Sequence, residues 1–580
     1  MRLSIVALIL ISMVCPMFAQ QTANRPIGLP QDWSTRHLIF TNGASADVAA
    51  AAQRDPRYWI NWMLHTANSF SNQNAIGTHT PKHLQTDWAM SLGGGFMPVG
   101  ETPAKFSFNI NGTPNCTNDF VVFTINATPG ANQANILAFN NLYTGTLSSS
   151  CPFGPQTPPT SDFTQPTFMW SYQAGASPIA LSPVLSLDGT KVAFIENSTP
   201  PTFDVLTPVT GQGTSATAPA TPGTGGSSLT QLAYTNTAVT GCTPNATTSD
   251  SDSSAYIDYI NDVAYVGADN GVLYRINGVF RSTPTLAYCV TVNATAGTHY
   301  LTSPIYDSIH NEVFVSDGYS VYGYTPGATG FTLVKSISVA AAAGPNPSIV
   351  LSPIVDPTNG FVYVFSRDDT TNAKAIATQI NEALTTQVQA GIGLKITGTG
   401  YNFILDGDFD NAYYTTGPKA GGGTLYACGT DNNNAAKPSL YALSFAAPNG
   451  TMNATPAVSD NRHINPAANP NSVCGPLLDF YDGTTDRLFV SVGTVGATTG
   501  GNQVTEWNVN TRIASSATTP NATATNYWGG ASAFSIDNVS TEPQAASIYF
   551  GTLSPPPALN TTPCGAGNYC AVKLTQSGLQ

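Results

Sequence analysis

The chain has few charged residues and no cluster of positive ones. Only 9% of its 580 residues are Asp, Glu, Lys or Arg, against roughly 25% in an ordinary soluble domain. Its 20 Lys and Arg stand against 33 Asp and Glu, a net charge of −13. Because nucleic acids and anionic membranes are bound through clustered Lys and Arg, this scatter argues against both as partners.

Long apolar runs and closely spaced cysteine pairs are also missing. After the N-terminus no apolar stretch is long enough for a membrane-spanning helix. No Cys pair has the Cys-x₂₋₄-Cys spacing of a zinc site, and no Gly-x-Ser-x-Gly motif of a serine hydrolase occurs. The chain is nevertheless expected to fold, since 42% of its residues are hydrophobic and 10% aromatic.

Residues 1–19 have the pattern of a secretory signal peptide. Arg2 supplies the positive charge, residues 3–14 are apolar, and Met-Phe-Ala at 17–19 provides a small-residue cleavage site. We therefore expect a secreted or periplasmic protein that is not inserted in a membrane.

Eight of the nine cysteines follow this signal, and an even number in an exported chain predicts disulfides. Sequential pairing is favoured among the many connectivities because each bridge would then close a loop of one repeat. The expected pairs are Cys116–Cys151, Cys242–Cys289, Cys428–Cys474 and Cys564–Cys570.

Residues 20–86 lack a strand pattern and are expected to form an N-terminal extension with one helix. Asp55 can cap this helix and Pro56 suits its first turn. Tyr58, Trp59 and Trp62 follow near helical spacing. Such an aromatic stripe is typical of a packing face, so we expect the helix to lie against the repeats that follow.

From residue 87 to residue 580 one phrase recurs. An apolar run ends in Asp, a tight turn follows, and a short strand of apolar and aromatic residues comes next. Residues 303–307 (Ser-Pro-Ile-Tyr-Asp) lead in this way to 313–315, and 352–356 (Ser-Pro-Ile-Val-Asp) lead to 362–364. A unit of about 50 residues made of short strands and turns indicates a radial or stacked β-repeat.

The second strand of this unit can be located eight times, and third and fourth strands follow in most units. Eight four-stranded units predict an all-β fold, a β-propeller of eight blades; seven is the alternative, because two repeats carry long insertions. Residues 87–92 are expected to complete the last blade and close the ring, which removes free sheet edges. The second-strand landmarks are 121–123, 192–194, 263–266, 313–315, 362–365, 412–414, 488–490 and 548–550.

In seven of the eight repeats an Asp is expected at the end of the strand before the turn, and the first repeat has Asn109 or Asn111 near that place. The Asp side chain can accept hydrogen bonds from backbone N–H groups two residues on and so close the turn. A ring of such carboxylates at one face would alternatively attract a cationic ligand. The residues are Asp188, Asp258, Asp307, Asp356, Asp406, Asp482 and Asp537.

Residues 266–274 (Val-Gly-Ala-Asp-Asn-Gly-Val-Leu-Tyr) and 352–364 are similar to the repeat of quinoprotein-like (PQQ-type) β-propellers. The chain as a whole resembles a group of exported bacterial propeller proteins. The resemblance implies the fold over most of residues 87–574. It brings no catalytic or PQQ-binding residue, since the adjacent cysteines and regularly placed Trp residues of quinoprotein dehydrogenases do not occur here.

One run has the pattern of a metal site. Asp406, Asp408 and Asp410 alternate in a predicted turn and would offer several hard oxygens to Ca²⁺. The downstream Glu of an EF-hand loop is missing. The alternative is that Asp406 is the recurrent turn Asp and its neighbours are solvated. No other cofactor is expected.

No set of residues with catalytic spacing is recognised. The sequence therefore favours an exported binding or surface-scaffold propeller whose extracellular ligand is a polysaccharide or a protein. The alternative is an enzyme on the same fold, since fold does not decide activity. It would be a cofactor-dependent, PQQ-like oxidoreductase or a carbohydrate-active enzyme, whose paired acids would be distant in sequence.

Overall fold

The structure is a computed structural model, and part of the chain is described in it. The predicted signal peptide lies outside the described residues. These are 29–31, 37–41, 45–65, 84–108, 115–143, 166–234, 239, 250–293, 300–341, 347–371, 373–396, 406–432, 438–446, 450–455, 462–463, 473–481, 485–493, 503–513, 520–525, 527, 529–538, 546–555, 564–565 and 567–576.

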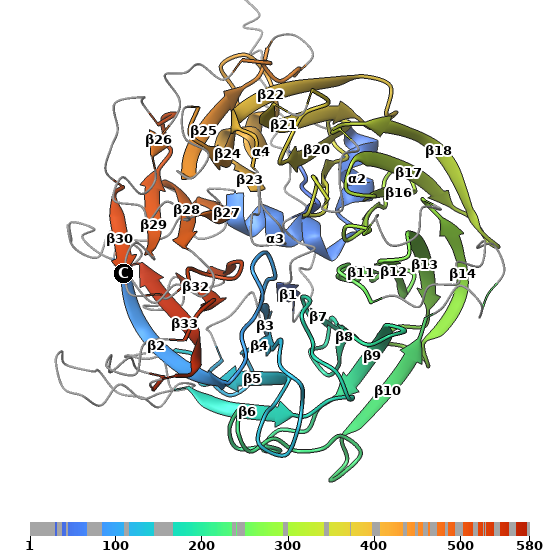
Figure 1. The fold of residues 1–580 in the computed structure, drawn as a ribbon, viewed down its shortest axis with the longest axis vertical. Helices are drawn as coiled ribbons and strands as arrows, with labels where there is room; N and C mark the ends of the chain where they lie inside the picture. Colours follow the sequence, from blue (N-terminus) through green and yellow to red (C-terminus); the bar gives the residue numbers. More distant parts are fainter. Residues whose placement is uncertain are drawn as a thin grey trace, which may run out of the picture.

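Eight antiparallel sheets stand around a common axis (Figure 1). Each has four strands in the order of a propeller blade, and blade 1 gains a fifth from the N-terminal extension. The predicted eight-bladed β-propeller is thereby confirmed, and the seven-bladed alternative is wrong.

Within each blade the strands are given below in order from the axis outward. Blade 1 consists of β3 (Ala104–Ser107), β4 (Phe120–Thr124), β5 (Ile136–Asn140) and β6 (Thr167–Tyr172), and blade 2 of β7 (Val184–Leu185), β8 (Val192–Glu196), β9 (Thr202–Thr207) and β10 (Ser228–Ala233). Blade 3 consists of β11 (Tyr256–Asp258), β12 (Val263–Ala268), β13 (Val272–Asn277) and β14 (Thr285–Thr291), and blade 4 of β15 (Ile305–Asp307), β16 (Glu312–Ser316), β17 (Ser320–Pro326) and β18 (Phe331–Ser338). Blade 5 consists of β19 (Ile354–Asp356), β20 (Phe361–Ser366), β21 (Lys374–Asn381) and β22 (Gln387–Leu394), and blade 6 of β23 (Asp406–Phe409), β24 (Thr424–Thr430), β25 (Pro438–Ser444) and β26 (Arg462–His463). Blade 7 consists of β27 (Val473–Tyr481), β28 (Asp486–Gly493), β29 (Gln503–Asn508) and β30 (Ala522–Thr525), and blade 8 of β31 (Ser535–Asn538), β32 (Ala546–Gly551), β33 (Tyr569–Gln576) and β2 (Leu84–Gly93).

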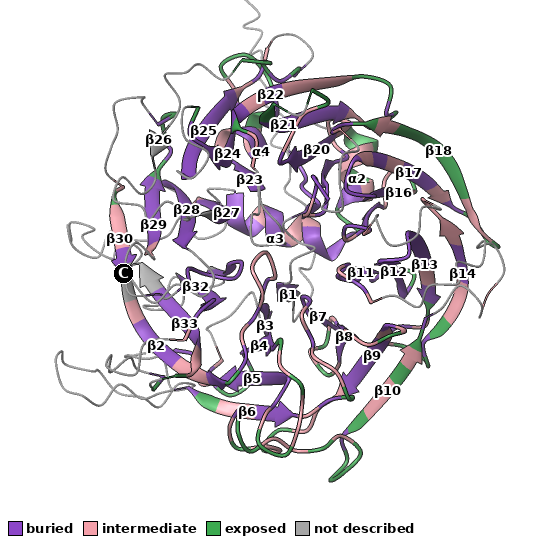
Figure 2. Cartoon of the chain, in the orientation of Figure 1, coloured by how far each residue is buried: buried purple, intermediate pink, exposed green. Residues whose placement is uncertain are grey.

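Burial explains why the second strands are so readable in the sequence. Every residue of β4, β8, β12 and β28 is buried, because each blade packs between two others. A strand covered on both faces is apolar at nearly every position. The outermost strands are more exposed, β18 most clearly (Figure 2).

The ring is closed by the earliest long strand of the chain. β2 pairs antiparallel with β33, from Leu84 opposite Gln576 to Gly93 opposite Tyr569. The expectation that residues 87–92 complete the last blade is confirmed, and the strand extends beyond those bounds at both ends.

Buried charges lie at the junction of blades 8 and 1, where Lys573 also donates to the Leu142 carbonyl of blade 1 at 3.0 Å. Lys573 on β33 lies 2.8 Å from Asp87 on β2, and Lys105 on β3 lies 3.0 Å from Asp537 on β31. The Tyr143 hydroxyl donates to Asp537 at 2.9 Å. Both lysine side chains are fully buried, so each depends on its carboxylate for compensation of its charge.

The N-terminal extension covers one end of the axis. It contributes β1 (Leu29–Gln31), α2 (Ala46–Ala52) and α3 (Pro56–His65), and α3 crosses the middle of the ring in Figure 1. The predicted helix is confirmed as α3, whereas α2, capped by Ser45, was not expected. No helix in the described ranges is long and apolar enough to cross a membrane.

The extension is fixed to β11, the first strand of blade 3, and to α4 (Asn411–Thr416) of blade 6. Arg57 donates to the carbonyl of Ile257 at 2.8 Å and lies over the Tyr256 ring. At the other end of α3, the His65 ring stacks on Tyr414 with 3.4 Å between centroids. These contacts confirm that the helix packs against one face of the propeller.

One predicted strand is wrong. Residues 412–414 belong to the short helix α4 (Asn411–Thr416), and the second strand of blade 6 is β24. Asp410 caps α4 by accepting a hydrogen bond from the Tyr413 backbone N–H at 3.0 Å. A run of three apolar or aromatic residues is found in helical turns as well as in strands. Here the capping side chain of Asp410 favours the helix.

Most of the expected turn aspartates have their expected role. Asp188, Asp258, Asp307 and Asp356 each accept a hydrogen bond from the backbone N–H two residues on, at 3.0, 3.0, 2.7 and 3.1 Å. Asp482 lies outside the described residues.

Two of the expected turn aspartates are placed differently. Asp406 is the first residue of β23, not the last. Asp537 lies inside β31, where it pairs with Lys105. A pattern of residue types does not show how two strands are paired, so it does not fix the position of an Asp along its strand.

We expect Lys105→Met to lower the free energy of unfolding by about 3–5 kcal/mol, because Asp537 would remain buried without its cation. Adding Asp537→Asn should restore part of the loss. The control is Lys335→Met on the exposed strand β18, which should change stability by less than about 0.5 kcal/mol. Urea denaturation followed by tryptophan fluorescence measures all three; equal effects of the two lysine substitutions would contradict a stabilising role for the buried pair.

Candidate functional site

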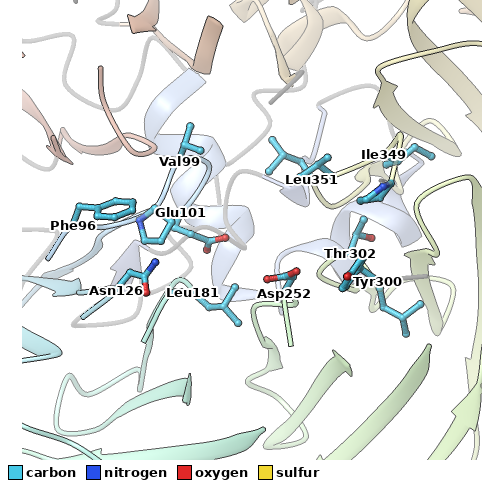
Figure 3. A pocket seen from close by; sticks show the side chains of 15 residues that line it. Phe96, Val99, Glu101, Asn126, Leu181, Asp252, Tyr300, Thr302, Ile349 and Leu351 are labelled. Carbon is cyan, nitrogen blue, oxygen red and sulfur yellow. The ribbon is translucent and has the colours of Figure 1, made fainter. Parts of the chain in front are cut away.

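At the end of the axis away from α3, a pocket of about 230 Å³ lies between the inner ends of the blades (Figure 3). Its walls come from residues 96–101 and from the segments before the first strands of blades 2 to 5. They include Phe96, Val99, Glu101, Leu181, Asp252 and Tyr300.

The segment that links β2 to β3 forms one wall. It is held by a hydrogen bond from the Asn126 backbone N–H to the Phe96 carbonyl, at 2.8 Å, and by one from Ala533 to the Glu101 carbonyl, at 2.7 Å. The close approach depends on Gly95, where a Cβ would lie 2.5 Å from side-chain carbons of the neighbouring blade.

A belt of hydroxyl groups explains the recurring Ser-Pro of the sequence. The backbone N–H of Thr102 donates to Ser182 Oγ at 2.9 Å, that of Ser182 to Ser254 Oγ at 3.1 Å, and that of Ser254 to Ser303 Oγ at 2.8 Å. Each of these residues stands two positions before a first strand. The belt therefore links blades 1 to 4 at the rim of the pocket.

Glu101 joins this belt through one oxygen. Its Oε2 accepts hydrogen bonds from the Ser182 N–H (2.7 Å), the Ser182 hydroxyl (2.6 Å) and the Ser254 hydroxyl (2.9 Å). Among the residues that the structure describes, none donates a hydrogen bond to Oε1. Burial raises the pKa of Glu101 to about 7, against the opposing effect of the two serines.

The pocket is acidic at one side, and most of its other lining residues are apolar. Asp252 faces the same space as Glu101 (Figure 3) and raises its pKa further. Behind Asp252, burial raises the pKa of Asp269 to about 8 and that of Asp250 to about 6. No Lys or Arg is among the residues that line the pocket in the described part of the chain. Such a site suits a ligand with a positive or hydrogen-bond-donating group beside an apolar part.

The sequence did not indicate this pocket. Glu101 carries no recognisable motif, and its partners Ser182 and Ser254 come from two other blades. The repeated Ser before each first strand was the available signal, since a polar residue at a fixed place before buried strands needs hydrogen-bond partners.

The predicted metal residues lie elsewhere: Asp406 and Asp408 are in β23, and Asp410 follows it. Asp406 accepts from the Leu477 backbone N–H at 3.3 Å, and Asp408 from that of Asp479 at 2.8 Å, so both link blade 6 to blade 7. Asp410 caps α4 instead. These backbone contacts account for the three carboxylates as structural acceptors, and calcium binding by them stays a prediction.

The predicted disulfide Cys564–Cys570 is present in blade 8, with 5.8 Å between the Cα atoms. Cys116, Cys289 and Cys428 are disulfide-bonded as well. Their expected pairing with Cys151, Cys242 and Cys474 involves side chains outside the described residues, so it stays a prediction.

No protein-family model matches the chain, and no curated protein matches it. Solved structures with a similar arrangement include BamB from Moraxella catarrhalis, at 12% identity over 85% of this chain and 100% of its own, with a TM-score of 0.42. Sqt1 from Saccharomyces cerevisiae has 10% identity over 86% and 100%, also with a TM-score of 0.42. At these values the likenesses assign neither a family nor a function. The assignment as a β-propeller rests on the strand pairing of this chain.

The raised pKa values of Glu101, Asp250 and Asp269 predict a protein that is more stable in mild acid. The folded state binds protons more tightly than the unfolded chain, whose carboxyls titrate near pH 4, so stability should fall as the pH rises from about 4 to about 8. The midpoint of thermal unfolding should therefore be higher at pH 5 than at pH 8. Glu101→Gln should reduce this difference, and a midpoint that rises towards pH 8 would contradict the assignment.

Proposed function

We propose that the protein is an exported, non-enzymatic binding protein that holds a segment of another protein in the axial pocket. A Lys side chain or a terminal amine of the partner would donate to Glu101 and Asp252, while Phe96, Val99 and Leu181 would contact its apolar residues. The observation that carries this proposal is the Glu101 carboxyl group in the pocket wall: three hydrogen bonds fix its Oε2, and none of the described residues donates one to its Oε1.

The compartment is proposed on two grounds. The N-terminal residues have the pattern of a signal peptide, and the Cys564–Cys570 bridge is typical of an oxidising compartment.

A protein partner is preferred over a polysaccharide because of the pocket walls. Sugars are bound largely through hydrogen bonds to hydroxyl groups, whereas the walls here include aliphatic side chains such as Val99, Leu181, Ile349 and Leu351. These side chains suit apolar residues of a peptide better. Charge supports the same choice, since a chain of net charge −13 attracts basic partners.

A carbohydrate-active enzyme is the second candidate, and one observation favours it. Glu101 and Asp252 face the same space from different blades (Figure 3), and glycoside cleavage uses two carboxyl groups around one bond. Incubation with a panel of polysaccharides, followed by reducing-sugar assay, distinguishes the two candidates. Released sugar that is lost in both Glu101→Gln and Asp252→Asn would favour the enzyme.

The binding proposal is tested on an array of heptapeptides with the same apolar residues and either a Lys or a Glu at one position. We expect retention of the Lys peptides alone. Glu101→Gln should weaken it by about tenfold to a hundredfold, the effect of losing a charge-assisted hydrogen bond. Affinity should also fall from pH 8 to pH 5, because Glu101, whose pKa is about 7, becomes protonated.

The matched control is Asp47→Asn on α2, which removes an exposed carboxylate away from the pocket. It should leave peptide retention unchanged. Equal retention of Lys and Glu peptides, or an equal loss in the two variants, would show that the pocket does not select a positive group.

A further inference from the structure

Three potential metal ligands meet at the turns of blades 4 and 5. One nitrogen of His310 and one oxygen each of Asp307 and Glu382 lie within 4.8 Å of one another, the one such group in the described ranges. Asp307 ends β15, His310 lies in the turn after it, and Glu382 follows β21 in the next blade. The cluster lies apart from the axial pocket, whose lining contains none of these residues.

The distances show that a single imidazole nitrogen faces both carboxylates. His310 Nδ1 lies 2.6 Å from Asp307 Oδ2 and 3.2 Å from Glu382 Oε2. Asp307 is itself fixed, since its Oδ1 accepts from the Ile309 N–H at 2.7 Å. Two ligands on rigid turns and one ring on a surface turn make a partly organised site.

Burial differs among the three in a way that leaves an entrance. The Asp307 side chain is fully buried and that of Glu382 is 13% exposed, but that of His310 is 44% exposed. The imidazole therefore forms the solvent-facing side, and an ion would reach the two carboxylates by displacing this ring slightly.

The negative charge around the cluster exceeds the positive charge. The acids Asp307, Asp356 and Glu312 all lie close enough to act on Glu382, and His310 is the one base among its main electrostatic neighbours. In addition, Glu382 Oε1 is buried and has no hydrogen-bond partner within the described residues. An unpaired buried oxygen of this kind is costly unless something compensates it.

We propose that Asp307, His310 and Glu382 bind a divalent transition metal ion of the zinc type, with Nδ1 and two carboxylate oxygens as ligands. Imidazole nitrogen and carboxylate oxygen bind zinc at about 2.0–2.2 Å, and three protein ligands leave a fourth position for water. In the metal-free protein the proton of the hydrogen bond between His310 Nδ1 and Asp307 Oδ2, 2.6 Å apart, occupies this place. Binding of the ion releases that proton to solvent, so the charges balance.

The geometry requires one adjustment. Ligand atoms around a tetrahedral zinc ion lie roughly 3.3–3.5 Å apart at these bond lengths, so the pair of His310 and Asp307 must separate from 2.6 Å. Rotation of the half-exposed His310 ring supplies this movement without changing β15 or β21. The ion would then connect blade 4 to blade 5 at their turns.

The inference is tested by isothermal titration of the chelator-treated full chain with zinc chloride. We expect one zinc ion per chain in the wild type and a higher midpoint of thermal unfolding with zinc than with EDTA. His310→Gln and Glu382→Gln should each weaken this binding by more than about tenfold, at least the effect of losing a supporting group around a metal. Calcium chloride should give much weaker binding, because calcium prefers oxygen ligands.

Glu312→Gln is the matched control. It removes the same charge from the same neighbourhood but no ligand, so the affinity should stay within about fivefold of the wild type, as for a partly exposed charge. Asp307 is left unchanged because it closes the turn after β15. Absence of binding at millimolar zinc, unchanged binding in His310→Gln, or equal losses in Glu312→Gln and Glu382→Gln would each overturn the inference. Circular dichroism confirms that the variants are folded.

Discussion

The pairing of β2 with β33 decides whether the eight blades form a ring. Without it blade 8 would lack its outer strand and the two ends of the sheet array would separate. The buried pair Lys573–Asp87 joins these two strands, and the buried pair Lys105–Asp537 joins blade 1 to blade 8. Opening the ring would therefore separate the two partners of each pair. The axial pocket depends on the same closure, because its wall at residues 96–101 is the link from β2 to β3.

Because Lys and Arg are scarce in this chain, many buried carboxylates are held by hydrogen bonds instead of by a cation. More than half of its 33 acidic residues are buried in the structure. Backbone N–H groups hold many of them, as at the turns after β11, β15 and β19 and between blades 6 and 7. An acceptor-rich side chain can therefore stabilise turns and blade contacts without a cation. The carboxyl groups of Glu101 and Glu382 have raised pKa values, and each has one oxygen that accepts no hydrogen bond from the described residues.

The two ends of the propeller differ in structure. The first is covered by α3, which is held by Arg57 and by the stacking of His65 on Tyr414. At the second end, the belt of hydroxyl groups links blades 1 to 4 beside the pocket. Binding at the open end is consistent with this division, because a rigid belt of hydrogen bonds fixes the Glu101 carboxylate before any ligand arrives.

The sequence by itself determined the features that follow from local patterns. These are the short buried strands, the number of repeats, the closing strand at residues 87–92, α3 and the Cys564–Cys570 bridge. Each of them follows from residue periodicity or short spacing, which a single chain displays directly. Tertiary structure decided what depends on partners from other blades. At residues 412–414 the helix α4 also has a partner in blade 7, because its first backbone N–H, at Asn411, donates to Asp486 at 2.8 Å. Glu101 meets Ser182 and Ser254, and His310 meets Glu382, only through the curvature of the ring, which no local pattern encodes.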